Sequence, residues 1–453
     1  MFRLLNALVN AWGIPELRKK LLFTLSMLMI YEAGIFIPTP GINGKELGRI
    51  FDQLAASTGG GLLNLLDMFT GGALSHATIF ALGIMPYISA TIIVETLLAT
   101  AIPALEKLRK EGMTGYRKLH QYSRYTTVVL AVVNSLMYAL LLERVIPQQF
   151  KAQIVLFPGI GFRLLTILTM TGGMALIMWL AEQITERGIG NGMSLLMTAS
   201  IVGRIPLAIR DLSVQLGPNG IQQSPLQPLA ILLMAAFLIL IVTTVIFVEQ
   251  GQRRIPVQYA RRVIGRKVYG GQSTYLPLKV NSGGVLPIIF AVSLLYFPIQ
   301  IATFIPQLHG LTTWFSSRTS LVFNVIYAVL ILFFTYFSTA LTASQFLEAA
   351  DQMKKVGAFI PGIRPGQSTV DYLDKILTRV TFVAGVYLVV IAILPDVIMA
   401  WMKIPPRVAG FFGGTSLLIV VGVTLDTMKQ IESHLLMRHY EGFFKSGRMK
   451  SRR

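Results

Sequence analysis

Ten apolar stretches, each long enough or nearly long enough to cross a bilayer as a helix, dominate the sequence. A helix needs roughly 20 predominantly apolar residues to span the hydrocarbon core. Only 13% of the residues are charged, against about 25% in soluble domains, so too few charges are left to cover a soluble surface. The sequence therefore predicts an all-α integral membrane protein, with spans at 21–37, 75–98, 126–142, 164–181, 193–209, 226–248, 285–305, 321–343, 380–400 and 411–425.

Basic residues are concentrated on one side of these predicted spans. An even number of spans places both termini on the same side, and most of the 40 lysines and arginines fall in segments on that side. The positive-inside rule assigns it to the cytoplasm. We therefore expect cytoplasmic termini: an amphipathic helix in 1–20, which acts at least as an anchor for the first span, and a basic tail in 429–453.

Two short sequences recur about half a chain apart. Residues 83–88 (GIMPYI) resemble 284–289 (GVLPII), and residues 192–197 (GMSLLM) resemble 414–419 (GTSLLI). Such echoes in consistent order indicate that five spans were duplicated to ten, and an odd number of spans per half forces the halves into inverted topology. We expect an N-terminal half at 21–209 and a C-terminal half at 210–428, with function at the interface between them.

Motifs of soluble enzymes are absent from the sequence. It contains no phosphate-binding loop and no GxSxG elbow, and Gly188–Gly192 lacks the spacing of a dinucleotide fingerprint. The five histidines include no pair three or four residues apart, so a helical metal site is not expected. The absence of cysteine excludes a disulfide-held extracellular protein. We expect neither catalysis nor a cofactor.

A short apolar segment between the first two spans is flanked by glycines on both sides. At 1.5 Å per residue, a helix over 62–69 would reach only about 12 Å, less than half of a roughly 30 Å hydrocarbon core. It cannot span the membrane. Two interpretations are open: a mobile helix inside a cavity on the outer side, or a re-entrant loop at the surface.

Across nearly its whole length the chain resembles the SecY family of protein-conducting channels. The resemblance rests on specific sequence motifs and not only on a similar amino-acid composition. They are 37–41 (IPTPG), 64–75, 80–90, 182–194 (EQITERGIGNGMS), 249–254 (EQGQRR), 276–281 (LPLKVN), 357–366 (GAFIPGIRPG) and 412–420 (FGGTSLLIV).

The resemblance implies two five-helix halves around an hourglass pore that is closed at its waist by apolar side chains. A constriction lined by aliphatic groups resists wetting, so it excludes ions while a polypeptide pushes it open. Without the resemblance, the same side chains would be read as ordinary packed core. The matching positions are Ile84, Ile88, Met197, Ile289 and Ile419, where Met197 departs from the family's isoleucine.

The resemblance also implies a plug at about 62–75 and a lateral gate between the second and seventh spans. Pro86 and Pro287 are expected to weaken the two gate helices by removing helical hydrogen bonds. Glu95 departs from the family's uncharged residue, and its carboxylate is either protonated or paired. The plug residues are Leu62, Leu63, Asn64, Leu65, Leu66, Asp67, Met68, Phe69, Gly71 and Gly72, and the gate also includes Ser89 and Asn281.

Long basic segments at 249–280 and 344–378 complete the predicted cytoplasmic side. Positive-inside bias alone would explain their charge, whereas the resemblance assigns them to docking of the ribosome and of the SecA motor ATPase. Guanidinium groups suit the phosphates and carboxylates of such partners. The residues predicted to dock are Arg253, Arg254, Arg261, Arg262, Arg266, Lys267 and Arg364.

Together these features predict a passive protein-conducting channel of the bacterial plasma membrane. It would export unfolded preproteins with signal sequences and release apolar segments sideways into lipid. The resemblance implies SecE- and SecG-like small subunits, and the basic charge implies anionic lipid as a neighbour. The alternatives are an inverted-repeat transporter for a small solute, or a scaffold that only recruits ribosomes.

Overall fold

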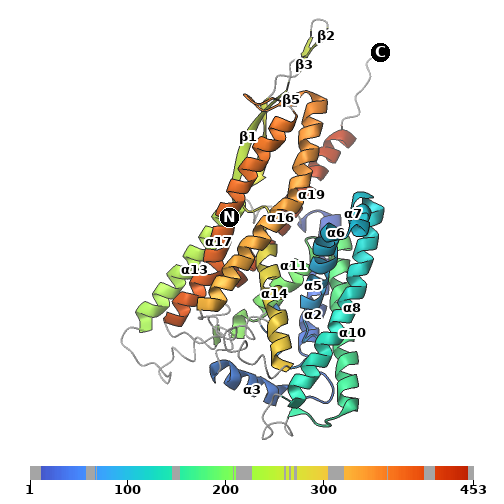
Figure 1. Ribbon diagram of the computed structural model, residues 1–453, viewed down its shortest axis with the longest axis vertical. Coiled ribbons are helices and arrows are strands. Elements are labelled where there is room, and N and C mark those ends of the chain that lie inside the picture. Colours follow the sequence, from blue (N-terminus) through green and yellow to red (C-terminus); the bar gives the residue numbers. More distant parts are fainter. Residues whose placement is uncertain are drawn as a thin grey trace.

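The computed structural model describes residues 12–57, 67, 69–144, 154–207, 209–210, 227–259, 262–264, 267–269, 273–304, 321–364, 366–401 and 414–446. Helices dominate these residues, and most run roughly along the long axis of the molecule (Figure 1). The first half contains α2 (Pro15–Ile35), α3 (Gly44–Ser57), α5 (Met85–Thr91), the π-helix η1 (Ile92–Leu98), α6 (Ala99–Ala101), α7 (Pro103–Lys110), α8 (Met113–Arg144), α10 (Ile160–Arg187) and α11 (Gly192–Gly203).

The second half contains longer helices and a small amount of strand. Its helices are α13 (Gln227–Gln250), α14 (Leu286–Phe304), α16 (Leu321–Val356), α17 (Gln367–Trp401) and α19 (Gly414–Ser446). The strands are β1 (Gln252–Tyr259), β2 (Arg262–Ile264), β3 (Lys267–Tyr269), β4 (Ser273–Lys279) and β5 (Ala358–Phe359).

Within the described residues, four helices are both long and apolar enough to cross a membrane. They confirm the spans predicted at 126–142, 164–181, 321–343 and 380–400, and the chain is a multi-pass membrane protein. Their outward faces carry exposed aliphatic side chains such as Leu168, which is 75% exposed, and Val329, which is 59% exposed. In water such faces would be costly, whereas lipid is their natural solvent.

The second predicted span differs from the expected continuous helix over 75–98. Residues 70–84 form successive turns, and α5 begins only at Met85. Gly71, Gly72 and Gly83 adopt positive φ values of 68°, 88° and 56°, which glycine accepts at little cost. Gly71 and Gly72, which were expected to follow a plug helix, and Gly83 of the predicted second span therefore all lie in turns before α5.

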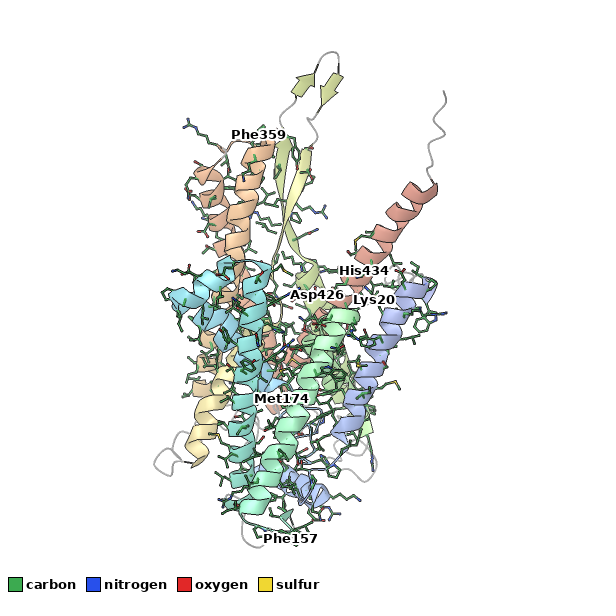
Figure 2. All side chains as sticks on the ribbon, turned by 90° about the vertical axis from the view of Figure 1, so that its right-hand side faces the viewer. Lys20, Phe157, Met174, Phe359, Asp426 and His434 are labelled. Carbon is green, nitrogen blue, oxygen red and sulfur yellow. The ribbon has the colours of Figure 1, made fainter. Side chains whose placement is uncertain are left out.

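Strands form where all-α structure was expected, in the segment 249–280. Antiparallel pairing gives the sheet order β4-β1-β5, while β2 and β3 form a separate hairpin. Ile255, Val257 and Leu278 bury one face of this sheet against residues of α17. The sheet lies at one end of the molecule and α3 at the other (Figure 1), and Figure 2 shows the same separation between Phe359 and Phe157.

The two sequence echoes adopt matching local structures. Gly83 and Gly284 have φ values of 56° and 58°, and each stands two residues before a helix whose second residue is proline. Gly192 and Gly414 each begin a helix. A Cβ atom at Gly192 would come within 1.9 Å of the Ala181 carbonyl oxygen, and one at Gly414 within 1.8 Å of the Ile391 carbonyl oxygen. These four glycines thus occupy equivalent positions in the two halves.

Candidate functional site

The aliphatic positions predicted to close a pore are all buried in one apolar cluster. Each is at most 6% exposed, and they come from both halves of the chain. Ile84 directly precedes α5, Ile88 lies within it, and one residue each comes from α11, α14 and α19. None faces the lipid side. Burial of this kind is required of a closed ring, and ordinary core packing produces it too, so the ring stays a prediction. The five are Ile84, Ile88, Met197, Ile289 and Ile419.

The two predicted gate helices, α5 and α14, contact each other in the structure. The expected role of their prolines is wrong, however. Pro86 and Pro287 lie in the first turn of their helices, where the backbone N–H has no intrahelical partner in any case. The prolines therefore fix where α5 and α14 begin and do not weaken them internally.

Asn281 lies just before α14 and binds a carboxylate that the sequence reading did not single out. Its Nδ2 donates to Oε1 of Glu249 at 2.6 Å and to the Gly284 carbonyl oxygen at 2.9 Å. Its own Oδ1 is buried without a hydrogen-bond partner. Ser89, on the facing gate helix α5, is also buried. Polar side chains are therefore buried both on α5 and just before α14.

Glu95 on η1 is paired, which answers the question that the sequence left open. Its Oε1 lies 3.0 Å from Nδ1 of His120 and accepts a hydrogen bond from Ser123 at 2.9 Å. The partners come from α8. No cation at matching depth was expected, and His120 was missed because a lone histidine 25 positions away carries no sequence signal.

The same histidine links Glu95 to a second carboxylate on α10. Nε2 of His120 lies 3.4 Å from Oε1 of Glu182, and the same oxygen accepts a hydrogen bond from Nε of Arg124 at 2.6 Å. Tyr116 stacks on the imidazole at a ring separation of 6.2 Å. We call Glu95, His120, Ser123, Arg124 and Glu182 the Glu95 network. It ties η1, which directly follows the first gate helix α5, to α8 and α10.

The predicted plug lies only partly within the described residues. Phe69 is 1% exposed and Asp67 is 5% exposed, so both are inside the protein. Oδ2 of Asp67 forms an ion pair of 2.8 Å with the guanidinium of Arg204, at the end of α11. Gly71 and Gly72 follow with positive φ. Leu62, Leu63, Asn64, Leu65, Leu66 and Met68 lie outside the described residues.

The predicted docking residues lie on or beside the strands. Arg253 and Arg254 are exposed on β1, opposite Leu278 and Pro277 of β4. Arg364 is exposed between β5 and α17. Arg262 and Lys267 belong to the β2–β3 hairpin, and Arg261 and Arg266 lie outside the described residues.

A polar cavity of about 440 Å³ opens between α11, β4 and α19. Asn191, Lys279, Asp426 and His434 contribute to its lining. Figure 2 shows Asp426 and His434 along α19, the latter nearer the end that carries the strands. The cavity therefore lies on the same side of the molecule as the basic segments.

Comparison with known proteins gives a consistent result over the full length. A model of the SecY family matches residues 78–428. The protein translocase subunit SecY of Mycobacterium bovis is 43% identical over 459 residues, covering 98% of this chain and all of the relative. The protein of the same name from Streptomyces scabiei is 45% identical over 451 residues, with the same coverage.

Solved structures share the fold at lower sequence identity. One described as a protein conducting channel aligns with a TM-score of 0.59 at 17% identity, over 95% of this chain and 94% of its own. Sec61 from a canine ribosome-channel complex of the endoplasmic reticulum aligns with a TM-score of 0.52 at 16% identity, with the same coverage. The described helices, the family model and the full-length relatives agree: this chain belongs to the SecY family.

Proposed function

We propose that the chain is the central channel subunit of a protein translocase and is not an enzyme. It conducts unfolded preproteins across the bacterial plasma membrane and releases apolar segments sideways into lipid. The observation that carries this proposal is the 43–45% identity to relatives over their full length. The burial of Ile84, Met197 and Ile289 in one cluster built from both halves is what a closed ring requires. Family membership supplies the context, since the full-length relatives are named translocase subunits.

The proposed architecture consists of ten spans in two inverted halves around an hourglass pore. The matched glycines of the two sequence echoes support the duplication, and an odd number of spans per half inverts it. The aliphatic ring excludes ions at the waist because a narrow apolar constriction does not wet. The segment 62–75 acts as the plug, and the contact between α5 and α14 is the closed lateral gate.

The end of the molecule that carries the strands is proposed to face the cytoplasm, together with both termini. Exposed arginines there suit the phosphates of ribosomal RNA and the carboxylates of SecA. SecE- and SecG-like subunits, signal sequences and anionic lipid complete the proposed partners. The canine structure is of a ribosome-channel complex. By that likeness we propose the ribosome as a partner of this chain as well.

Crosslinking to a stalled preprotein tests the channel. A photoreactive residue at Ile84 or Ile289 should capture the stalled chain, while one at lipid-facing Leu168, which is 75% exposed, should not. Equal capture at all three positions, or at Leu168 alone, would refute the proposed path. Uptake of small solutes into liposomes should stay at background, and the solute-transporter alternative is not supported by the relatives.

Salt titration tests the docking surface. Because cationic contacts to phosphate release counterions, ribosome affinity should fall steeply between 50 and 200 mM salt, by roughly ten-fold for every two phosphate contacts. Neutral substitutions at Arg253 and Arg254 should reduce the slope of that dependence. A flat salt dependence would contradict the proposed docking.

A further inference from the structure

Asp67 is a buried carboxylate whose two oxygens are both engaged. Oδ1 accepts a hydrogen bond from the Ser75 backbone N–H at 2.7 Å, and Oδ2 pairs with Nη1 of Arg204 at 2.8 Å. The Asp67 side chain is 6% exposed and the Arg204 side chain 20%. The pair is therefore largely shielded from water. A shielded ion pair is screened less by solvent and salt than an exposed one.

The two partners come from distant parts of the chain. Arg204 caps the C-terminal end of α11, and Asp67 precedes the turns that lead into α5. Gly72 lies over the guanidinium, since a Cβ atom there would come 3.3 Å from Nη2 of Arg204. A side chain at this position would crowd the arginine, so glycine lets the backbone approach it closely.

The segment that follows Asp67 is a tightly bonded unit. The Asp67 carbonyl oxygen accepts hydrogen bonds from the Gly72 N–H at 2.8 Å and from Oγ1 of Thr70 at 3.0 Å. Tyr138 of α8 donates its hydroxyl hydrogen bond to the Leu74 carbonyl oxygen at 2.7 Å. One side of the unit is thus bonded to α8. On the α11 side, Asp67 pairs with Arg204, and Gly71 packs against Ser200.

Apolar side chains border the segment that carries Asp67, and the Glu32 carboxylate lies beside Gly203, the neighbour of Arg204. The pair is costly to separate because it is largely enclosed. Phe69 and Ile35 are at most 6% exposed, and a Cβ atom at Gly71 would meet Cδ1 of Ile35 at 2.9 Å. Removing one partner of a buried ion pair leaves an uncompensated charge. The structure with Asp67 against Arg204 is therefore favoured as long as both charges are present.

We propose that Arg204 is a positioning residue that holds Asp67, and with it the turns at 69–75, in place against α11. The inference rests on the proposed function, because it requires that residues 62–75 act as the plug. When the plug moves, the 2.8 Å contact must open, so the strength of this pair sets part of the cost of leaving the closed state. Loss of the pair should make the resting channel leaky and less dependent on a strongly apolar signal.

Three variants separate the charge of the pair from simple damage to the fold. Arg204→Gln removes the positive charge, and Arg204→Lys keeps a positive charge as the smaller ammonium group. Asp67→Asn combined with Arg204→Gln removes both charges, so that neither is left unpaired. Glu32→Gln is the matched control. Its carboxylate lies beside Gly203, where a Cβ atom would come 2.8 Å from Oε2, and its Oε1 has no hydrogen-bond partner.

The experiment measures small-anion leak from vesicles that contain the translocase isolated from its own membranes, together with preprotein transport by the same vesicles. We expect Arg204→Gln and the double variant to raise the resting leak at least five-fold while transport continues. Arg204→Lys should return it to within two-fold of the unsubstituted protein, and Glu32→Gln should leave it unchanged.

Two results would overturn the proposed positioning role of Arg204. The first is an unchanged leak in the double variant with transport intact, and the second is an equal leak in Glu32→Gln. Should Arg204→Gln fail to fold, the double variant still decides the question, because it buries no unpaired charge. Failure of the unsubstituted complex to transport preprotein would instead count against the proposed function.

Discussion

Two of the described charged clusters differ in how many charged side chains each one joins. Asp67 and Arg204 form a single ion pair between the plug segment and α11. The Glu95 network joins η1, α8 and α10, and its histidine contacts two carboxylates. A single pair opens when one contact is lost, whereas a network keeps other contacts after any one is broken. The first suits a part that moves, and the second suits a part that is held.

The positions of the clusters fit this difference. Arg204 ends α11, which is 12 residues long, and Asp67 adjoins turns rather than a long helix. The Glu95 network lies where η1 packs along α8, whose 32 residues also pack against α10. The Glu95 network therefore joins three helices of the first half, whereas the Asp67–Arg204 pair joins the turns after Asp67 to the end of α11.

Breaking the network at its centre should produce the largest effect. Glu182→Ala leaves His120 with one carboxylate and Arg124 with none from this network. The free energy of unfolding should therefore fall by about 2 kcal/mol. This is less than for a fully buried pair, because Arg124 is partly exposed. Thermal unfolding in lipid nanodiscs measures the loss. Glu186→Ala removes an exposed carboxylate from the same helix and should leave the midpoint unchanged; equal losses would refute the network.

A milder change at the edge of the network tests its link to the proposed gate. Glu95→Gln keeps an oxygen acceptor for Ser123 but removes the charge that faces His120, at a cost of about 1.5 kcal/mol. The first gate helix is then held less firmly, so less apolar signal sequences should open the channel. Export across a series of signals of graded hydrophobicity measures the threshold, and His120→Gln should shift it in the same direction. An unchanged threshold in both variants would contradict this role.

The fixed side of the plug segment gives a smaller expected effect. Tyr138→Phe removes the hydrogen bond to the Leu74 carbonyl oxygen and leaves that buried acceptor short of a donor, at a cost of about 1 kcal/mol. Protease accessibility of the plug segment in the resting complex should rise modestly. Tyr122→Phe, at an exposed position of the same helix, provides the control. If both variants respond alike, Tyr138 does not anchor the segment.

The smallest effect is expected inside the aliphatic cluster. Met197→Ile exchanges a flexible thioether for a branched side chain of similar volume, and such exchanges usually cost less than about 1.5 kcal/mol. Resting leak should therefore stay within two-fold of the unsubstituted protein, because the wall remains apolar. Met197→Ser should leak clearly more. A large leak in the isoleucine variant would show that side-chain flexibility, and not only hydrophobicity, is needed there.

Much of this architecture could be predicted from the sequence because hydropathy acts locally. Long apolar stretches must become helices in lipid, since no water is present to satisfy an open backbone. That reasoning predicted the helices around residues 126–142 and 321–343, and the family motifs predicted the fold. The repeated hexamer also marked Gly83 and Gly284 as equivalent positions in the sequence. The structure gives both of them a similar positive φ.

Contacts between distant residues were decided only by the tertiary structure. The sequence could mark Glu95 as unusual but not His120 as its partner, and it could place Asp67 in a plug but not Arg204 against it. The helix-weakening role expected of Pro86 was wrong for the same reason, because where a helix begins depends on the turns packed before it. Pairing energies depend on distance in space, and a chain of 453 residues brings such pairs together only when it folds.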